Sequence, residues 1–228
     1  MINISQIPVY KQKHNKWITH NFDIIGLGNP KRVGNIMDFL SKRNPNTILE
    51  FWEKWTRYKK NRERFENVVY DIQRAKSCNT VTAYEIAFIG IIYNSYMGFC
   101  AERAASEYIL KKFPNSEVRK TDKQFDNKYA VDLLAYDPED DTYAGIQVKS
   151  NKSKNTNNTK FVERNLKKNK LFEKKYKCPV IYLYYEAYYT PYKQTFNIYF
   201  NGDRPTWAEK KEELVTEFLS SNKIVALK

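Results

Sequence analysis

Residues 128–150, KYAVDLLAYDPEDDTYAGIQVKS, decide the fold of this chain. They predict two short strands joined by the turn sequence PEDD. Along the second strand Ile146 and Val148 point to one face, and Gln147 and Lys149 point to the other. An amide and an ammonium group on an interior face need polar partners, because an unpaired buried polar group is costly.

An acidic residue stands inside the first of these strands. Asp132 is flanked by apolar residues in AVDLLAY, where a solvated acid is not expected. Antiparallel pairing through the turn would bring Asp132 close to Gln147 and Lys149 on the second strand. The alternative is a purely structural acid that forms a cross-strand ion pair with Lys149.

These residue types suit metal-assisted hydrolysis of a phosphodiester. A carboxylate and a neighbouring carbonyl oxygen can hold a hard cation such as Mg2+, which keeps several of its waters. A lysine beside that ion can orient or deprotonate a water, or stabilise charge that grows on a phosphate. Asp132, Gln147 and Lys149 are therefore candidate catalytic residues, with Asp132 and Gln147 as candidate Mg2+ ligands.

A helix that precedes the strands adds a fourth candidate. The segment GFCAERAASEYILKKF, residues 98–113, predicts an amphipathic helix that ends before Pro114. One face carries small and apolar residues, namely Gly98, Ala101, Ala104, Ala105, Tyr108 and Ile109. Glu102 falls at the edge of that face, near the expected sheet, as a candidate catalytic residue and metal ligand. The alternatives are an ion pair with Lys149 and a boundary glutamate that reaches solvent.

The order of elements predicts an α/β fold, in which a mixed central sheet is flanked by helices and follows a mainly helical N-terminal region. After the helix at 98–113 we expect strands at 116–122, 128–137, 142–150, 178–189 and 195–200, with helices at 160–176 and 206–221. In the N-terminal region residues 1–30 read as irregular or partly extended, and helices are expected at 33–44 and 47–76.

The charge balance favours an anionic partner. The 228 residues include 39 Lys and Arg against 26 Asp and Glu, a net charge of +13. Nucleic acid is the commonest partner for such a chain, although a generally lysine-rich protein is the alternative. Residues 149–177 are densest in positive charge, and residues 57–64 form a second basic patch whose alternative is a solvated helix face.

The polar loop after the second strand supplies candidate DNA contacts. Lysine neutralises phosphates, and asparagine can read adenine or donate to phosphates. The candidate DNA-binding residues are Lys152, Lys154, Asn155, Asn157, Asn158 and Lys160. The alternative is a flexible, solvated linker.

Several function classes are disfavoured. Three widely spaced cysteines argue against a disulfide framework and a structural zinc site. The two histidines, His14 and His20, have no nucleophile motif nearby, which disfavours Ser-His-Asp and Cys-His mechanisms. No apolar run approaches the length of a signal core or membrane span, so we expect a cytoplasmic protein without a membrane partner.

Asp132, followed about fifteen residues later by GIQVKS with Gln147 and Lys149, resembles the signature of the PD-(D/E)XK nuclease superfamily. The resemblance covers residues 97–190 and implies a restriction-endonuclease-like core, with Glu102 matching a glutamate on the preceding helix of many members. Val131 stands where a proline is usual. Gln147 replaces the usual acid, as in Mrr-like members, and removes one negative charge from the site.

The segment NPKRVGNIMDFLSKRNPNTILEFWEKW, residues 29–55, resembles restriction endonucleases of the MjaI type. That likeness implies a type II enzyme that cuts double-stranded DNA at a short palindrome with Mg2+ as a homodimer. Residues 91–228 would form the nuclease core. Residues 1–90 would pack on it and take part in DNA contact or dimerisation. The alternatives are a structure-specific nuclease, such as a Holliday junction resolvase or repair enzyme, and an inactive nucleic-acid-binding module.

Overall fold

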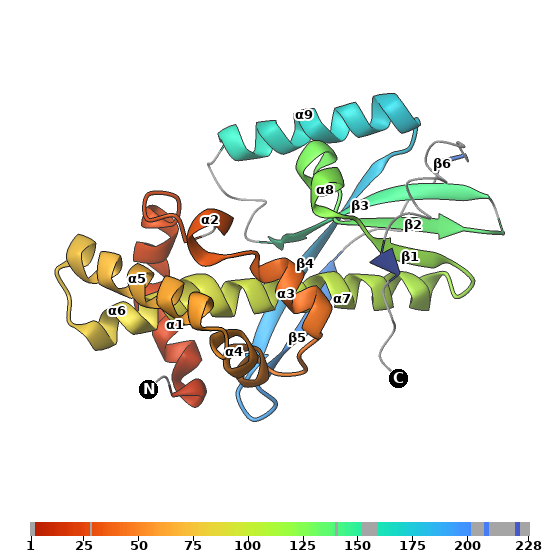
Figure 1. Cartoon of the computed structure of the whole chain (residues 1–228). Coiled ribbons are helices and arrows are strands. Elements are labelled where there is room, and N and C mark those ends of the chain that lie inside the picture. The colour runs from red at the N-terminus through yellow and green to blue at the C-terminus, as the bar shows by residue number, and fades with distance from the viewer. Residues whose placement is uncertain are drawn as a thin grey trace. The chain divides into compact units, whose positions relative to one another are not determined.

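The computed structural model describes residues 3–27, 29–139, 141–151, 159–201, 208–209 and 222–223 (Figure 1). The chain divides into two compact units. The first consists of Met1–Cys100 with Tyr188–Asn197, and the second of Ala101–Ala187 with Ile198–Lys228. Within the described residues, no helix is long and apolar enough to cross a membrane.

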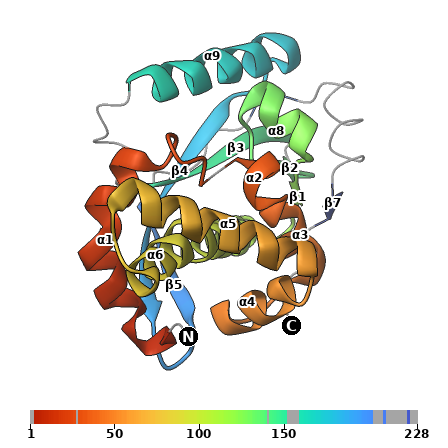
Figure 2. The same ribbon diagram turned by 60° about the vertical axis from the view of Figure 1, so that its left-hand side comes forward.

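The first unit is mainly helical, as expected. Its helices are η1 (Ile4–Gln6), α1 (Ile7–Asn21), α2 (Pro30–Val33), α3 (Ile36–Arg43), α4 (Ile48–Thr56), α5 (Lys59–Lys76), α6 (Thr80–Ala87) and the π-helix η2 (Phe88–Tyr93). Helices α5 and α6 pack against each other (Figure 2). The helix α7 (Asn94–Lys112) begins in this unit and continues into the second.

The prediction that residues 1–30 are irregular is wrong, because α1 occupies half of them. Pro8 stands in the first turn of α1, where its missing N–H has no helical partner to lose. The helix buries Ile7, His14 and Ile18, which recur at helical spacing. Because only these three of the fifteen residues are buried, the helical period is weak in the sequence.

The single helix expected at 47–76 is two helices. The helix is interrupted at Arg57 and Tyr58, and Tyr58 has an extended backbone before α5 begins. The break lets Trp55 of α4 meet Phe65 of α5, with ring centroids 6.4 Å apart. The aromatic residues at the end of α4 therefore build the core of this unit rather than a recognition surface.

The second unit contains most of the sheet, and the end of β4 and the start of β5 belong to the first unit. After α7 the elements in chain order are β1 (Glu117–Lys120), α8 (Lys123–Tyr129), β2 (Leu133–Asp137), β3 (Thr142–Ser150), α9 (Thr159–Tyr176), β4 (Val180–Thr190), β5 (Thr195–Asn201), β6 (Ala208–Glu209) and β7 (Asn222–Lys223). The strand order is β5-β4-β3-β2-β1-β7, and β6 pairs with β3. Strands β2 and β3 are antiparallel, whereas β3 and β4 are parallel and joined through α9. The predicted α/β fold with a mixed central sheet is confirmed.

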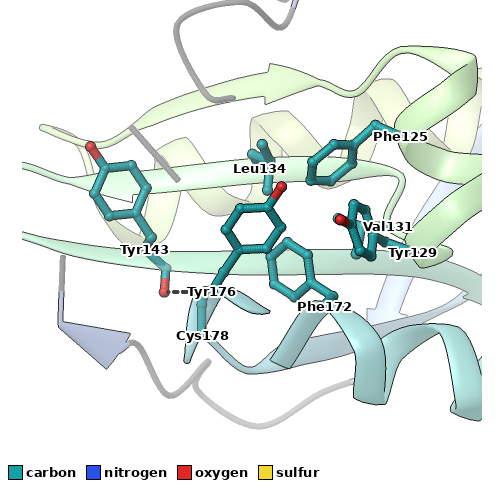
Figure 3. Packing of buried hydrophobic residues seen from close by; sticks show 8 residues of the cluster. All are labelled: Phe125, Tyr129, Val131, Leu134, Tyr143, Phe172, Tyr176 and Cys178. Carbon is teal, nitrogen blue, oxygen red and sulfur yellow. Dashed lines mark hydrogen bonds between the residues drawn. The ribbon is translucent and has the colours of Figure 1, made fainter. Parts of the chain in front are cut away.

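An apolar cluster packs α8 and α9 against one face of this sheet (Figure 1). Figure 3 shows its members, which are Phe125, Tyr129, Val131, Leu134, Tyr143, Phe172, Tyr176 and Cys178. A Cβ atom at Gly145 would lie 2.8 Å from the Phe172 ring, so the absence of a side chain in β3 lets α9 approach closely. The packing fixes α9 over the strand that carries Gln147 and Lys149.

Two expectations in this unit need correction. The strand expected at 128–137 begins only at Leu133, because α8 occupies the chain before it. Asp122 caps α8 by accepting a hydrogen bond from the Phe125 N–H at 2.7 Å. The final helix expected at 206–221 is wrong at Ala208–Glu209, which pair as β6 with β3. The rest of that expected helix lies outside the described residues.

Candidate active site

The site lies at the end of the β2–β3 pairing where β2 begins. Leu133 pairs with Ile146, and the N–H of Asp132 donates to the carbonyl of the same Ile146, so Asp132 lies at the end of the β2–β3 ladder, close to the part of β3 that carries Gln147. The expected antiparallel pairing of the two strands is confirmed, although Asp132 immediately precedes β2 instead of lying inside it.

Backbone groups on both sides fix Asp132. Its N–H donates to the Ile146 carbonyl at 2.8 Å. Its Oδ2 accepts from the Val148 N–H at 2.7 Å. The side chain thus takes the place of a backbone acceptor at the end of the β2–β3 ladder, and the carboxylate is held in one orientation.

Gln147 is the most completely buried polar residue of the site. Only 1% of its surface is exposed. Its Oε1 has no hydrogen-bond partner among the residues that the structure describes. A buried carbonyl oxygen without a donor is costly unless something else satisfies it. A hard cation or its bound water would do so, and the oxygen therefore fits the metal that this residue type and position suggested.

Lys149 lies two residues beyond Gln147 on β3 and is half-buried. The alternation of a strand puts both side chains on the same face. Burial raises the pKa of Asp132 above its ordinary value, and the Lys149 charge opposes that rise. No ion pair within 4 Å joins Asp132 to a described residue, so a simple cross-strand salt bridge does not account for this acid.

Glu102 on α7 pairs with a lysine that the sequence reading did not consider. Its carboxylate accepts from Lys120 Nζ of β1 at 2.5 Å, so the ion pair considered with Lys149 is formed with Lys120 instead. Burial raises the pKa of Glu102 to about 7. The Lys120 ammonium opposes this rise, and the negative charge of Asp132 adds to it.

Asp126 on α8 is an acid of the same neighbourhood that sequence reasoning missed. Burial, followed by the charge of Asp132, raises its pKa to about 6, and Lys149 and Lys168 act in the opposite direction. The cap residue Asp122 was a usable signal for a short helix here. Strands were expected at 116–122 and 128–137, and no element was predicted for the residues between them, which include Asp126.

The negative charge of Asp132 raises the pKa of both Glu102 and Asp126, and that of Asp126 also raises the pKa of Glu102, so a cation among the three acids would relieve this repulsion. They do not form a ready-made carboxylate cage. No group of three or more His, Cys, Asp and Glu side chains in the described part of the chain is placed to hold a metal. A hard ion here would rely on Asp132, the Gln147 oxygen and water.

The candidate DNA-binding residues fall largely outside what the structure describes. This applies to Lys152, Lys154, Asn155, Asn157 and Asn158. The backbone of Lys160 lies in the first turn of α9. In the second basic patch, at residues 57–64, Lys59, Lys60 and Arg62 are on α5, with both lysines exposed.

Other side chains that could act as a nucleophile or base make contacts within the folded core. His14 is buried in the first unit, with Nε2 2.7 Å from Glu85 Oε2. Cys178 donates to the Tyr143 carbonyl at 3.0 Å (Figure 3), and burial raises the pKa of its thiol to about 12. A thiol held neutral in this way is a poor nucleophile. None of the three cysteines forms a disulfide.

Comparison with protein families gives one match. The family model described as "MjaI restriction endonuclease" matches residues 16–190, more than half of the chain. The matched range contains Glu102, Asp126, Asp132, Gln147 and Lys149. Neither the curated proteins nor the solved structures give a match.

Proposed function

The chain belongs to the MjaI restriction endonuclease family and is thus an endonuclease that acts on DNA, and on this premise we propose that it is a type II enzyme. In this proposal it hydrolyses phosphodiester bonds of double-stranded DNA at a short specific sequence, with Mg2+, through a PD-(D/E)XK-type site. The observation that carries the proposal is the buried Gln147 oxygen, which has no hydrogen-bond partner among the described residues and belongs to the residue just before Val148, whose N–H holds the carboxylate of Asp132.

Each residue of the site has a role in this proposal. Asp132 and Gln147 would hold Mg2+, which when bound stabilises phosphate charge and makes a bound water more acidic. Lys149 orients the attacking water and donates to the phosphate as its negative charge grows. Glu102, held by Lys120, supports the site from α7. The water oxygen bonds to phosphorus as one ester P–O bond breaks, leaving a phosphate monoester and a hydroxyl.

The remaining parts follow from the type II reaction. A palindromic target presents the same half-site on each strand, so two copies of the chain related by twofold symmetry would cut both strands. The helical region of residues 1–90 would serve DNA contact or dimerisation, beside the core of residues 91–228. The alternatives are a nuclease specific for branched DNA and a binding module that Gln147, in place of an acid, has left inactive.

Digestion of plasmid DNA tests the proposal. With Mg2+ the purified chain should give discrete fragments, and chelation of the metal should stop cleavage because the Asp132 site then lacks its cation. The complex with DNA that contains the target sequence should hold two copies of the chain. Cleavage of branched DNA alone would favour a structure-specific nuclease, and binding without any cleavage would favour the inactive module. Either result would overturn the type II assignment.

We further expect the loop after β3 to contact phosphates. Replacing Lys152, Lys154 and Lys160 together with Ala should flatten the dependence of log affinity on log salt by at most roughly 2 to 3 per subunit, because each lost contact removes about 0.9 from the slope. The measurement is a salt titration of DNA binding in Ca2+.

A matched variant in the other basic patch provides the control for the replacement of Lys152, Lys154 and Lys160. Replacing Lys59, Lys60 and Arg62 of α5 with Ala removes the same charge from the chain as a whole. If the loop faces DNA, single-turnover cleavage by the loop variant at saturating DNA stays near wild type while its salt slope falls. A slope that changes only in the α5 variant would place the duplex against α5.

A further inference from the structure

Two buried side chains hold the carbonyl groups of the turn that leads into β2, residues 129–132, here called the Asp132 turn. Asn169 Nδ2 of α9 donates to the Tyr129 and Ala130 carbonyls at 2.9 and 3.0 Å. Thr121 Oγ1 lies 2.6 Å from the Val131 carbonyl and 3.2 Å from that of Asp132. Asn169 and Thr121 are 3% and 5% exposed.

The Asn169 amide can adopt only one orientation. Its nitrogen faces two carbonyl oxygens, and its Oδ1 accepts from the Tyr182 hydroxyl of β4. Reversing the amide would place oxygen against both carbonyls. The residue therefore ties α9, the Asp132 turn and β4 together through three hydrogen bonds.

This arrangement explains why a side chain ends the β2–β3 ladder. Hydrogen-bonded positions in an antiparallel pair recur at every second residue. Continuing from the bond between the Asp132 N–H and the Ile146 carbonyl, the next acceptor for the Val148 N–H would be the Ala130 carbonyl. Ala130 instead has a left-handed backbone, with φ of 54°, and its carbonyl faces Asn169. The Val148 N–H is left for Asp132 Oδ2.

We infer that Asn169 and Thr121 are positioning residues of the nuclease site. They fix the Asp132 turn so that the carboxylate of Asp132 already has its working orientation before DNA and metal arrive. The inference rests on the proposed role of Asp132 as a metal anchor. Both side chains are buried and bonded to backbone carbonyls, so they would act on the site through the backbone, and the Tyr182 hydroxyl holds Asn169 in turn.

The test uses substitutions that change hydrogen bonding with little change in volume. Thr121→Val removes the hydroxyl, Thr121→Ser keeps it, and Asn169→Asp replaces both donated protons with an oxygen. Thr121→Val and Asn169→Asp should raise the Mg2+ concentration for half-maximal cleavage by about tenfold or more, the range seen when support behind a metal ligand is lost. Thr121→Ser should stay close to wild type.

A readout without catalysis accompanies the cleavage assay. The Ca2+ concentration that gives half-maximal DNA binding should rise in the same variants. Controls in the first unit are Thr56→Val and Asn21→Asp, which remove side-chain bonds to the Trp52 and Trp17 carbonyls. These controls should lower the melting temperature without moving either metal titration, so that a general loss of stability is distinguished from misplacement of Asp132.

The outcomes separate this inference from the proposed function. If Asp132→Asn abolishes cleavage while Thr121→Val and Asn169→Asp keep wild-type metal titrations, the positioning role is wrong and the proposed site stands. If Asp132→Asn cleaves normally, the proposed site itself is wrong. If Thr121→Val and Asn169→Asp do not fold, Tyr182→Phe replaces them in the test, because it removes only the hydroxyl that donates to Asn169. An unchanged titration in Tyr182→Phe would then count against the positioning role.

Discussion

Asp132→Asn should leave a folded protein that binds DNA and no longer cleaves it. The amide has the shape of the carboxylate, and its oxygen can still accept from the Val148 N–H. The charge that would hold Mg2+ is lost. A bound metal contributes several kcal/mol to the stabilisation of charge in the transition state, and about 1.4 kcal/mol is a factor of ten in rate. The loss in single-turnover cleavage should therefore reach about 10³-fold or more.

Asp137→Asn is the matched control for this prediction. Asp137 lies at the other end of β2, is buried, and accepts from the Glu139 N–H at 3.1 Å. The same chemical change there should leave cleavage near wild type. Circular dichroism and DNA binding in Ca2+ establish that both variants are folded. Undiminished cleavage by Asp132→Asn, or by wild type freed of metal, would show that the reaction does not use this carboxylate.

Sequence periodicity was sufficient to predict β3 and its pairing with β2, although not the residue at which β2 begins. Alternation in residues 142–150, with a polar turn before them, predicted β3 and its antiparallel partner, and hence the approach of Asp132 to Gln147. The same alternation could not predict that every residue from Tyr143 to Val148 is buried. Helices cover both faces of this sheet (Figure 1), and the number of covered faces depends on elements distant in the chain.

The missed features depend on short elements or on distant contacts. A helix of seven residues such as α8 spans two turns, too few for a clear helical period, so Asp126 was not considered. The ion pair of Glu102 with Lys120 follows from the packing of α7 against β1. Asn169 reaches carbonyls about forty residues earlier in the chain. No local pattern marks a side chain that acts through a distant backbone group.

Removal of the ammonium group at position 149 should abolish most of the activity as well. The Lys149 side chain shares a strand face with Gln147, and its charge acts on Asp132 and Asp126. Loss of one preorganised donor to a developing charge typically lowers the rate by roughly 10²–10³-fold. We expect Lys149→Ala to show this loss in single-turnover cleavage at saturating DNA and Mg2+. Binding in Ca2+ should change little, because one phosphate contact is a small part of the total.

Two further variants identify the cause of the loss. Lys149→Met keeps a long unbranched side chain in the half-buried position and removes only the charge, so it should be as inactive as Lys149→Ala. Lys168→Ala removes another lysine whose charge acts on Asp126, from α9 instead of β3, and should cleave near the wild-type rate. If Lys149→Met cleaves like wild type, the role of Lys149 is packing of the strand. If Lys168→Ala is as impaired as Lys149→Ala, the reaction depends on the summed positive charge around Asp126 and Asp132, and no single lysine acts on the phosphate.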